Sequence, residues 1–153
     1  MFNYLYIILY FESILRINIT TETSESDTRV KLIDPKLKKS GWDESKIIRE
    51  HTVTDGKIID AQGNRNPDRF ADYVLHGGMI VAIVEAKDEN KDPLIGLKQA
   101  KNYCKMLEVK FAFSSNGHKI EEFDFTTNKQ RTINEFPTHI ELYYRLIEGS
   151  SEN

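Results

Sequence analysis

Three charged residues stand at the ends of the most hydrophobic stretch of the sequence, ADYVLHGGMIVAIVEAKDENKDP (residues 71–93). Asp72 opens one apolar run, and Glu85 and Lys87 close the next. Because burial of an unpaired charge is costly, these positions need an explanation. Two carboxylates at strand ends are hard oxygen ligands of the kind that Mg²⁺ prefers, and a neighbouring lysine can orient a water that attacks a phosphodiester. The residue types therefore favour metal-assisted phosphodiester hydrolysis.

The register of the expected hairpin decides whether these side chains meet. Side chains alternate between faces along a strand, so Glu85 and Lys87 share one face. If the two glycines alone form the loop, Asp72 pairs with Ile83 and lies on that same face, roughly 7–8 Å from Glu85 along a diagonal. Two carboxylates ~4 Å apart repel by about 4 kcal/mol at an effective dielectric near 20, so a cation should offset them. An odd-numbered loop without a compensating bulge would turn Asp72 away.

The same charges also have a purely structural interpretation. Asp72 can bond local amides at the start of a strand, and Glu85 with Lys87 can form a solvated edge pair worth under about 1 kcal/mol. A strand that ends in Glu-x-Lys is common. On spacing alone, the structural interpretation is the better supported.

A helix predicted from about Pro93 to Glu108 favours the catalytic interpretation over the structural one. Its buried face is formed by apolar residues at helical spacing: Leu97, Ala100, Cys104 and Leu107. A second stripe is basic and fits either a solvated surface or a DNA backbone: Lys98, Lys101 and Lys105. Gln99 and Tyr103, at i and i+4, share a third stripe. A basic stripe beside two acids is what a phosphate backbone needs in a chain whose net charge is −3.

Composition and element order predict one α/β domain. The chain has 153 residues, 39% hydrophobic and 29% charged, which suits a single core. Cys104 is the only cysteine, so no disulfide can form within the chain. The histidines lack ligand spacing, so we do not expect a structural zinc site. We expect a central mixed sheet flanked by helices. Its predicted elements are a helix over 23–41 with a kink or break at Pro35, strands within 47–59 around a turn at 54–57, strands at 72–75, 79–86, 109–114 and 120–125, and a helix near 139–147.

The first 19 residues, MFNYLYIILYFESILRINI, are treated separately. Their apolar run is shorter than the roughly 20 residues that span a bilayer, and a basic region and a cleavage site are lacking. An extra helix or strand packed on the domain, a mis-assigned start and a loosely ordered leader all stay open. We therefore expect an uncertain leader over 1–19, one α/β domain over 20–148, a tail over 149–153, a cytoplasmic location and no membrane partner.

From residues 20 to 145 the sequence resembles the N-terminal nuclease domain of type I restriction enzyme R (HsdR) subunits, within the PD-(D/E)XK nuclease superfamily. Five motifs in order carry the resemblance: SESDTR with LIDP and GW (24–29, 32–35 and 41–42), ADYVL (71–75), VEAK (84–87), the QxxxY motif QAKNY (99–103), and FSSNG (113–117). Glu-x-Lys alone is weakly specific, whereas the ordered set is specific. Asp68 follows Pro67 as in the superfamily name but lacks the ADYVL context, so Asp72 is the matched acid.

The resemblance implies a restriction-endonuclease-like core and a role for each matched residue. Asp72 and Glu85 would bind Mg²⁺, with Glu25 as a further candidate for its outer shell, and Lys87 would position the water. Gln99 and Tyr103 would lie near the site and contact DNA or support the metal-bound geometry.

The resemblance also implies partners. These are double-stranded DNA and, as candidates, the methylation and specificity subunits of a type I complex. Such subunits also carry an ATP-driven motor, but no GxxxxGK[ST] phosphate loop occurs in this chain, so ATP would bind only to a full-length R subunit. The alternatives are an inactive nuclease-fold module that binds DNA or restriction-complex subunits, and an unrelated α/β domain.

Overall fold

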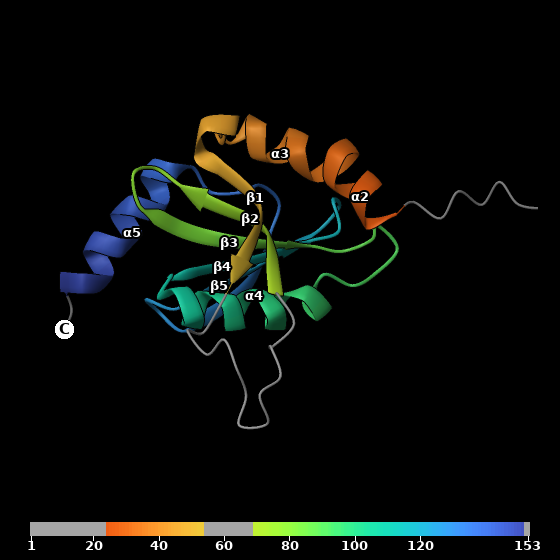
Figure 1. The fold of residues 1–153 in the computed structure, drawn as a ribbon. Helices are drawn as coiled ribbons and strands as arrows, with labels where there is room; N and C mark the ends of the chain where they lie inside the picture. Colours follow the sequence, from red (N-terminus) through yellow and green to blue (C-terminus); the bar gives the residue numbers. More distant parts are fainter. Residues whose placement is uncertain (1–23, 54–68, 152–153) are drawn as a thin grey trace, which may run out of the picture.

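Six strands form one mixed sheet in the computed structural model, which describes residues 24–53 and 69–151 (Figure 1). The strands follow chain order across the sheet: β1 (Ile47–Val53), β2 (Arg69–His76), β3 (Ile80–Ala86), β4 (Phe111–Ser115), β5 (Ile120–Asp124) and β6 (Lys129–Ile133). β3 and β4 are parallel and every other neighbouring pair is antiparallel. The parallel pair needs a crossover, which α4 (Leu94–Leu107) supplies. The predicted α/β fold with a mixed sheet and flanking helices is confirmed.

Helices cover both faces of the sheet (Figure 1). α4 packs its buried stripe on one face, against Val74 and Ile83 among others. The other face is covered by α2 (Glu25–Thr28), η1 (Arg29–Ile33), α3 (Asp34–Lys39) and α5 (His139–Ser151), with the short η2 (Glu44–Lys46) leading into β1. Trp42 is buried there as predicted, and its Nε1 donates to the Pro137 carbonyl at 2.9 Å. The sheet thus lies between two separate hydrophobic clusters.

The N-terminal helical segment contains two short α-helices joined by a π-helical stretch, so the interruption predicted at Pro35 lies just before that residue. Ser24 caps α2 and exchanges hydrogen bonds with Asp27 in a capping box. Pro35 stands in the first turn of α3, where its missing N–H costs no helical bond. The π-helical stretch Arg29–Ile33 joins α2 to α3. π-Helical turns often occur at functional sites, and Arg29 lies in this one.

The hairpin register differs from the one predicted. Its loop has three residues, Gly77 to Met79, so His76 pairs with Ile80. A β-bulge then shifts the register, and Leu75 pairs with Ala82. The predicted pairing of Asp72 with Ile83 is therefore wrong by two residues, because it assumed a two-glycine loop. The bulge offsets the odd loop, so the face that Asp72 shares with Glu85 is unchanged.

β6 was missed by the sequence reading. Its residues, KQRTI, are mostly exposed and lack the alternating apolar pattern that marks a strand, because they form the sheet edge beyond β5. The final helix also extends to Ser151, beyond the predicted end near Ile147. The apolar leader, the turn at 54–57 and Asp68 lie outside the described residues.

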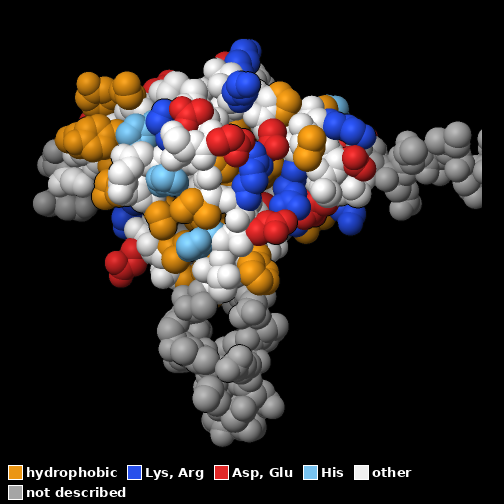
Figure 2. Space-filling model, turned by 45° about the horizontal axis from the view of Figure 1, so that its top comes forward, with side chains coloured by type: hydrophobic (Ala, Val, Ile, Leu, Met, Phe, Trp, Pro, Cys, Tyr) orange, Lys and Arg blue, Asp and Glu red, His pale blue; other side chains and the backbone are white. Residues whose placement is uncertain are grey.

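The outer surface is mixed in character. Figure 2 shows acidic and basic side chains interspersed over the face formed by the N-terminal helices, with hydrophobic side chains gathered toward α5. That helix buries Leu142 on the sheet and exposes a second apolar stripe: Ile140, Tyr143, Tyr144 and Ile147. Among the described residues, no helix has both the length and the apolar character needed to cross a bilayer.

Candidate active site

Asp72 and Glu85 lie side by side where β2 and β3 separate. Continuing the register of Tyr73 with Val84 brings Asp72 opposite Glu85. Each carboxylate accepts from the other strand: Asp72 Oδ2 from the Ala86 N–H at 2.8 Å, and Glu85 Oε1 from the Asp72 N–H at 3.3 Å. The acids thus replace ladder hydrogen bonds between the two strands. The predicted convergence of the two side chains is observed, and it is closer than the diagonal that the sequence suggested.

Burial makes the charge on Glu85 costly. Its side chain is only 1% exposed, and burial raises the pKa of its carboxyl to about 8, with a further contribution from the negative charge of Asp72. The Asp72 N–H and the Lys87 ammonium oppose this shift. Glu85 is therefore mainly protonated at neutral pH unless a cation favours its ionised form. Strongly shifted carboxyl groups are typical of functional sites.

Lys87 continues the line of β3 and lies close to the first helix. Its main-chain N–H donates to the Ser115 carbonyl at 2.8 Å, which holds the end of the strand beside β4. Its Nζ lies 3.6 Å from Glu25 Oε2. The structure therefore brings Glu25, the least certain of the predicted site residues, to the lysine rather than into contact with the two acids.

Arg29 belongs to the site but was not singled out by the sequence reading. Its guanidinium contacts Asp72 Oδ1 at 3.3 Å and Glu50 Oε1 at 3.2 Å. Glu50 lies on β1 with a left-handed φ of 51°, between residues that pair with β2. The SESDTR motif contained Arg29, but an arginine on a helix gives no sign of which distant strand it will meet. Arg29 supplies part of the positive charge that the paired acids require.

Gln99 and Tyr103 form a pair of their own on α4. Gln99 Nε2 donates to Tyr103 Oη at 2.9 Å, and the Tyr103 side chain is buried against the sheet. In the described part of the chain, neither side chain is hydrogen-bonded to Asp72, Glu85 or Lys87. Both line an open cavity of about 440 Å³. Their predicted contacts with DNA or the site stay predictions.

The three predicted DNA-binding lysines of α4 differ in their surroundings. Lys98 and Lys105 are exposed, and Lys98 borders the cavity lined by Gln99 and Tyr103. Lys101 is half-buried, with its Nζ 3.6 Å from the centre of the Phe123 ring, a cation–π contact. Lys101 is thus less available to a phosphate than the other two.

Asp72 and Glu85 have the donor chemistry of a Mg²⁺ site. Among the described residues, no three Asp, Glu, His or Cys side chains are grouped to hold a metal ion. Mg²⁺ usually takes one or two carboxylates and keeps several waters, so two acids are sufficient. A cation there would also offset both burial and the charge of Asp72, the two main causes that raise the Glu85 pKa. The carboxylates of Asp72 and Glu85 are therefore suitable ligands for Mg²⁺.

Comparison with known proteins identifies the family. The family described as the second domain of the type I restriction enzyme EcoKI endonuclease subunit matches residues 57–137, more than half of the chain. The chain belongs to the type I restriction enzyme endonuclease subunits. The predicted relation to these subunits is confirmed.

Two relatives support the assignment. The type I restriction enzyme EcoAI endonuclease subunit of Escherichia coli is 31% identical over 134 residues, covering 80% of this chain and 16% of that protein. A solved fragment assigned to an HsdR subunit of a type I restriction enzyme from Vibrio vulnificus YJ016 is 38% identical, with a TM-score of 0.76 over 86% of this chain and 27% of that one. The chain therefore spans only a minor part of the length of either relative.

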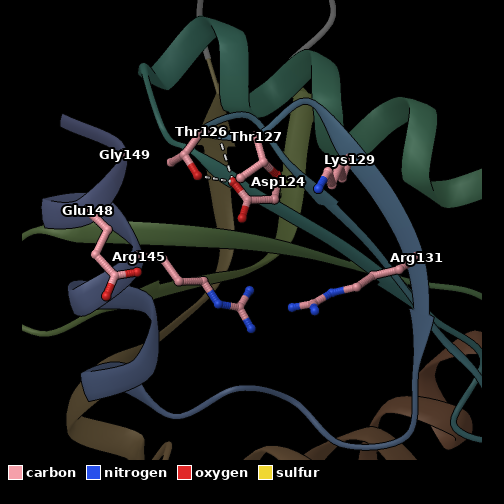
Figure 3. Close-up of a pocket in the computed structure, with 8 residues that line it drawn as sticks. All are labelled: Asp124, Thr126, Thr127, Lys129, Arg131, Arg145, Glu148 and Gly149. Carbon is pink, nitrogen blue, oxygen red and sulfur yellow. Dashed lines mark hydrogen bonds between the residues drawn. The ribbon is translucent and has the colours of Figure 1, made fainter. Parts of the chain in front are cut away.

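The endonuclease-subunit domain contains a second buried acid, Glu122 on β5. Its carboxylate accepts from Arg145 Nη1 at 2.6 Å and from Arg131 Nε. Arg145, from α5, and Arg131, from β6, extend toward one another at a cavity of about 360 Å³ that Asp124 and Glu148 also line (Figure 3). The hydrogen bond and the charge of Glu122 raise the Arg131 pKa. This arrangement joins α5 to the sheet edge and leaves the acid with its charge balanced.

Proposed function

We propose that this domain is a Mg²⁺-dependent DNA endonuclease domain of a type I restriction-modification system, which hydrolyses phosphodiester bonds with a metal-activated water. One observation carries the proposal: Asp72 within β2 and buried Glu85 near the end of β3 lie side by side, with Lys87 two residues beyond Glu85. The endonuclease-subunit relatives support it.

The chain's own residues would divide the work. Asp72 and Glu85 would hold Mg²⁺, which supplies a more acidic bound water and offsets the charge that develops on the phosphate. The Ala86 N–H fixes the Asp72 carboxylate in place. Lys87, held near Glu25, would orient the attacking water and donate to its deprotonated form. Lys98 and Lys105 would approach the DNA backbone, and Gln99 and Tyr103 would contact DNA beside Lys98.

Double-stranded DNA is the proposed substrate, and the methylation and specificity subunits of a type I complex are proposed partners. Nothing in the described residues resembles an element that reads base edges, so sequence selection would come from a partner. ATP would act only in a full-length R subunit.

Lys87→Ala tests the proposal directly. Purified protein is incubated with supercoiled and linear DNA plus Mg²⁺, and DNA binding is measured in parallel. We expect Lys87→Ala to lose cleavage by more than ~100-fold and to keep DNA binding, because the lysine acts on the water rather than on the duplex. Lys91→Ala, an exposed lysine in the following loop, is the matched control and should cleave normally. Full cleavage by Lys87→Ala would sink the proposal.

The second candidate is an inactive nuclease-fold module that binds DNA or restriction-complex subunits. The observation in its favour is that Arg29 and Lys87 supply positive charge by pairing with Asp72 and Glu25. Calorimetric titration separates the two candidates. An absence of Mg²⁺ binding, together with retained DNA binding, would favour the inactive module.

A further inference from the structure

Ser114 carries a buried hydroxyl without a hydrogen-bond partner. The residue is 0% exposed, and its Oγ is the single buried side-chain polar atom within the described residues that makes no hydrogen bond. The next residue shows the contrast: Ser115 Oγ donates to the Lys119 carbonyl at 2.9 Å and accepts from the Gly117 N–H at 3.0 Å. Buried polar groups without partners are rare and destabilise a fold, so each calls for a reason.

The strand register places Ser114 beside the candidate active site. β3 and β4 are parallel, with Glu85 paired to Ser114. Paired residues point to the same face of a sheet, so the hydroxyl shares the face of Asp72, Glu85 and Lys87. Ser115, one residue on, faces the other side. The side chains of the consecutive buried residues Ser114 and Ser115 therefore lie on opposite faces of β4.

Gly96 of α4 keeps the space above this hydroxyl open. A Cβ at Gly96 would lie 2.3 Å from Ser114 Oγ and 2.8 Å from Lys87 Cε. The helix therefore crosses directly over both side chains, and the missing Cβ leaves room for them. Lys87 passes through the same gap toward Glu25. An alanine in place of Ser114 would fill this position without any buried polar atom.

We propose that Ser114 is a positioning residue whose hydroxyl donates to the Glu85 carboxylate when a divalent cation is held there. Glu85 accepts one hydrogen bond, from the Asp72 N–H at 3.3 Å, for its two oxygens. A carboxylate that ligates a metal is normally oriented by an outer hydrogen bond of this kind. The hydroxyl, which has no partner among the described residues, would gain an acceptor when Glu85 holds the cation. The inference rests on the proposed function, because it assigns Glu85 a cation.

For Ser114→Ala in the full chain, we predict different effects on the unfolding temperature and on the affinity for Mg²⁺. In EDTA, the unfolding temperature should stay the same or rise, because an unsatisfied buried hydroxyl has been removed. In calorimetric titration with Mg²⁺, the affinity should fall about 10-fold or more. The Mg²⁺ concentration for half-maximal cleavage should rise to match, with kcat at saturating Mg²⁺ largely kept. A purely structural serine would instead lower the unfolding temperature and leave the affinity unchanged, which would overturn the proposal.

Two further variants complete the test. Ser115→Ala, which removes two hydrogen bonds on the other face, should lower the unfolding temperature and bind Mg²⁺ normally. Ser114→Cys keeps a weak donor on a somewhat larger side chain, so its affinity should lie between those of serine and alanine. Reduced kcat in Ser114→Ala with unchanged Mg²⁺ affinity would overturn the assignment to Glu85. Wild type that binds no Mg²⁺ would remove the proposed function itself, whereas equal binding by wild type and Ser114→Ala would overturn the Ser114 role alone.

Discussion

Among the buried glutamates of the sheet, Glu122 and Glu85 have opposite electrostatic surroundings. Glu122 is 0% exposed and is held by two arginines from neighbouring elements. Glu85 is 1% exposed, receives one N–H at 3.3 Å, and faces a second acid, Asp72. The positive charge near it is divided: Arg29 contacts Asp72, and Lys87 lies closer to Glu25. One acid is neutralised by its surroundings and the other is not.

The difference is the one expected between a stabilising cluster and a functional one. A buried carboxylate that pairs with two arginines fixes the elements which contribute them, here α5 and β6 to β5. A buried carboxylate opposed by another acid costs folding free energy, which natural proteins accept mainly at sites that bind or react. The contrast supports assigning the cation site to Glu85 and a structural role to Glu122.

The largest expected effect is on cleavage. Glu85→Gln should reduce Mg²⁺-dependent DNA cleavage by at least about 1000-fold, because it removes a metal ligand and its charge. Glu122→Gln is the matched control, since it makes the same chemical change in a buried acid that two arginines neutralise, and it should retain specific activity in its folded fraction. Equal losses of specific activity in the two variants would erase the functional contrast between them.

The next largest effect is on the free energy of unfolding, where Glu122→Gln should have the larger effect and Glu85→Gln the smaller one. Glu122→Gln should lower the free energy of unfolding by about 3 kcal/mol, because Arg131 and Arg145 lose the charge that pairs with them. Glu85→Gln in EDTA should be neutral or stabilising near pH 8. Urea unfolding at that pH measures both. A Glu85→Gln protein destabilised as strongly as Glu122→Gln would contradict the contrast.

The effect that is smaller per pH unit is the pH dependence of stability. The Glu85 pKa is raised from 4.5 to about 8 on folding. Between these values the unfolded chain is ionised and the folded chain keeps its proton, so stability contributed by this group is present below pH 4.5 and lost as pH rises through 8. The slope from this group is at most about 1.4 kcal/mol per pH unit in metal-free protein. Urea unfolding of wild type and Glu85→Gln from pH 5 to 8.5 should show a shallower fall in the variant. Parallel curves would remove the claim that Glu85 is protonated at neutral pH.

The smallest effects concern the lysines of α4. Lys98→Gln and Lys105→Gln should each weaken DNA binding and reduce the slope of log affinity against log salt by about 0.9, if each contacts one phosphate. Lys101→Gln should change the slope less, because Lys101 already lies over the Phe123 ring. Fluorescence anisotropy with a short duplex across a salt series measures all three. A larger change for Lys101 than for Lys98 would reverse the order that the structure suggests.

Much of the fold and the two main acids of the candidate site, Asp72 and Glu85, could be predicted from the sequence. Hydrophobic runs and turn residues located β2, β3, β4, β5 and α4, since burial imposes patterns that a single chain displays. β6 escaped because an exposed edge strand has no such pattern. The hairpin pairing was wrong by two residues, since neither the three-residue loop nor the bulge has a unique sequence sign. Arg29 and Ser114 were missed as site residues because their neighbours there are distant in sequence.

By itself, the sequence determined which residues have the chemistry for a site and, through ordered motifs, the family to which they belong. Alternation along strands was enough to put Glu85 and Lys87 on one face. Only the tertiary structure decided which acid would be neutralised and which would not. That outcome depends on where arginines from other elements reach and on how deeply each carboxylate is buried. Both are set by the packing of α5 and the N-terminal helices on the sheet, which local sequence does not encode.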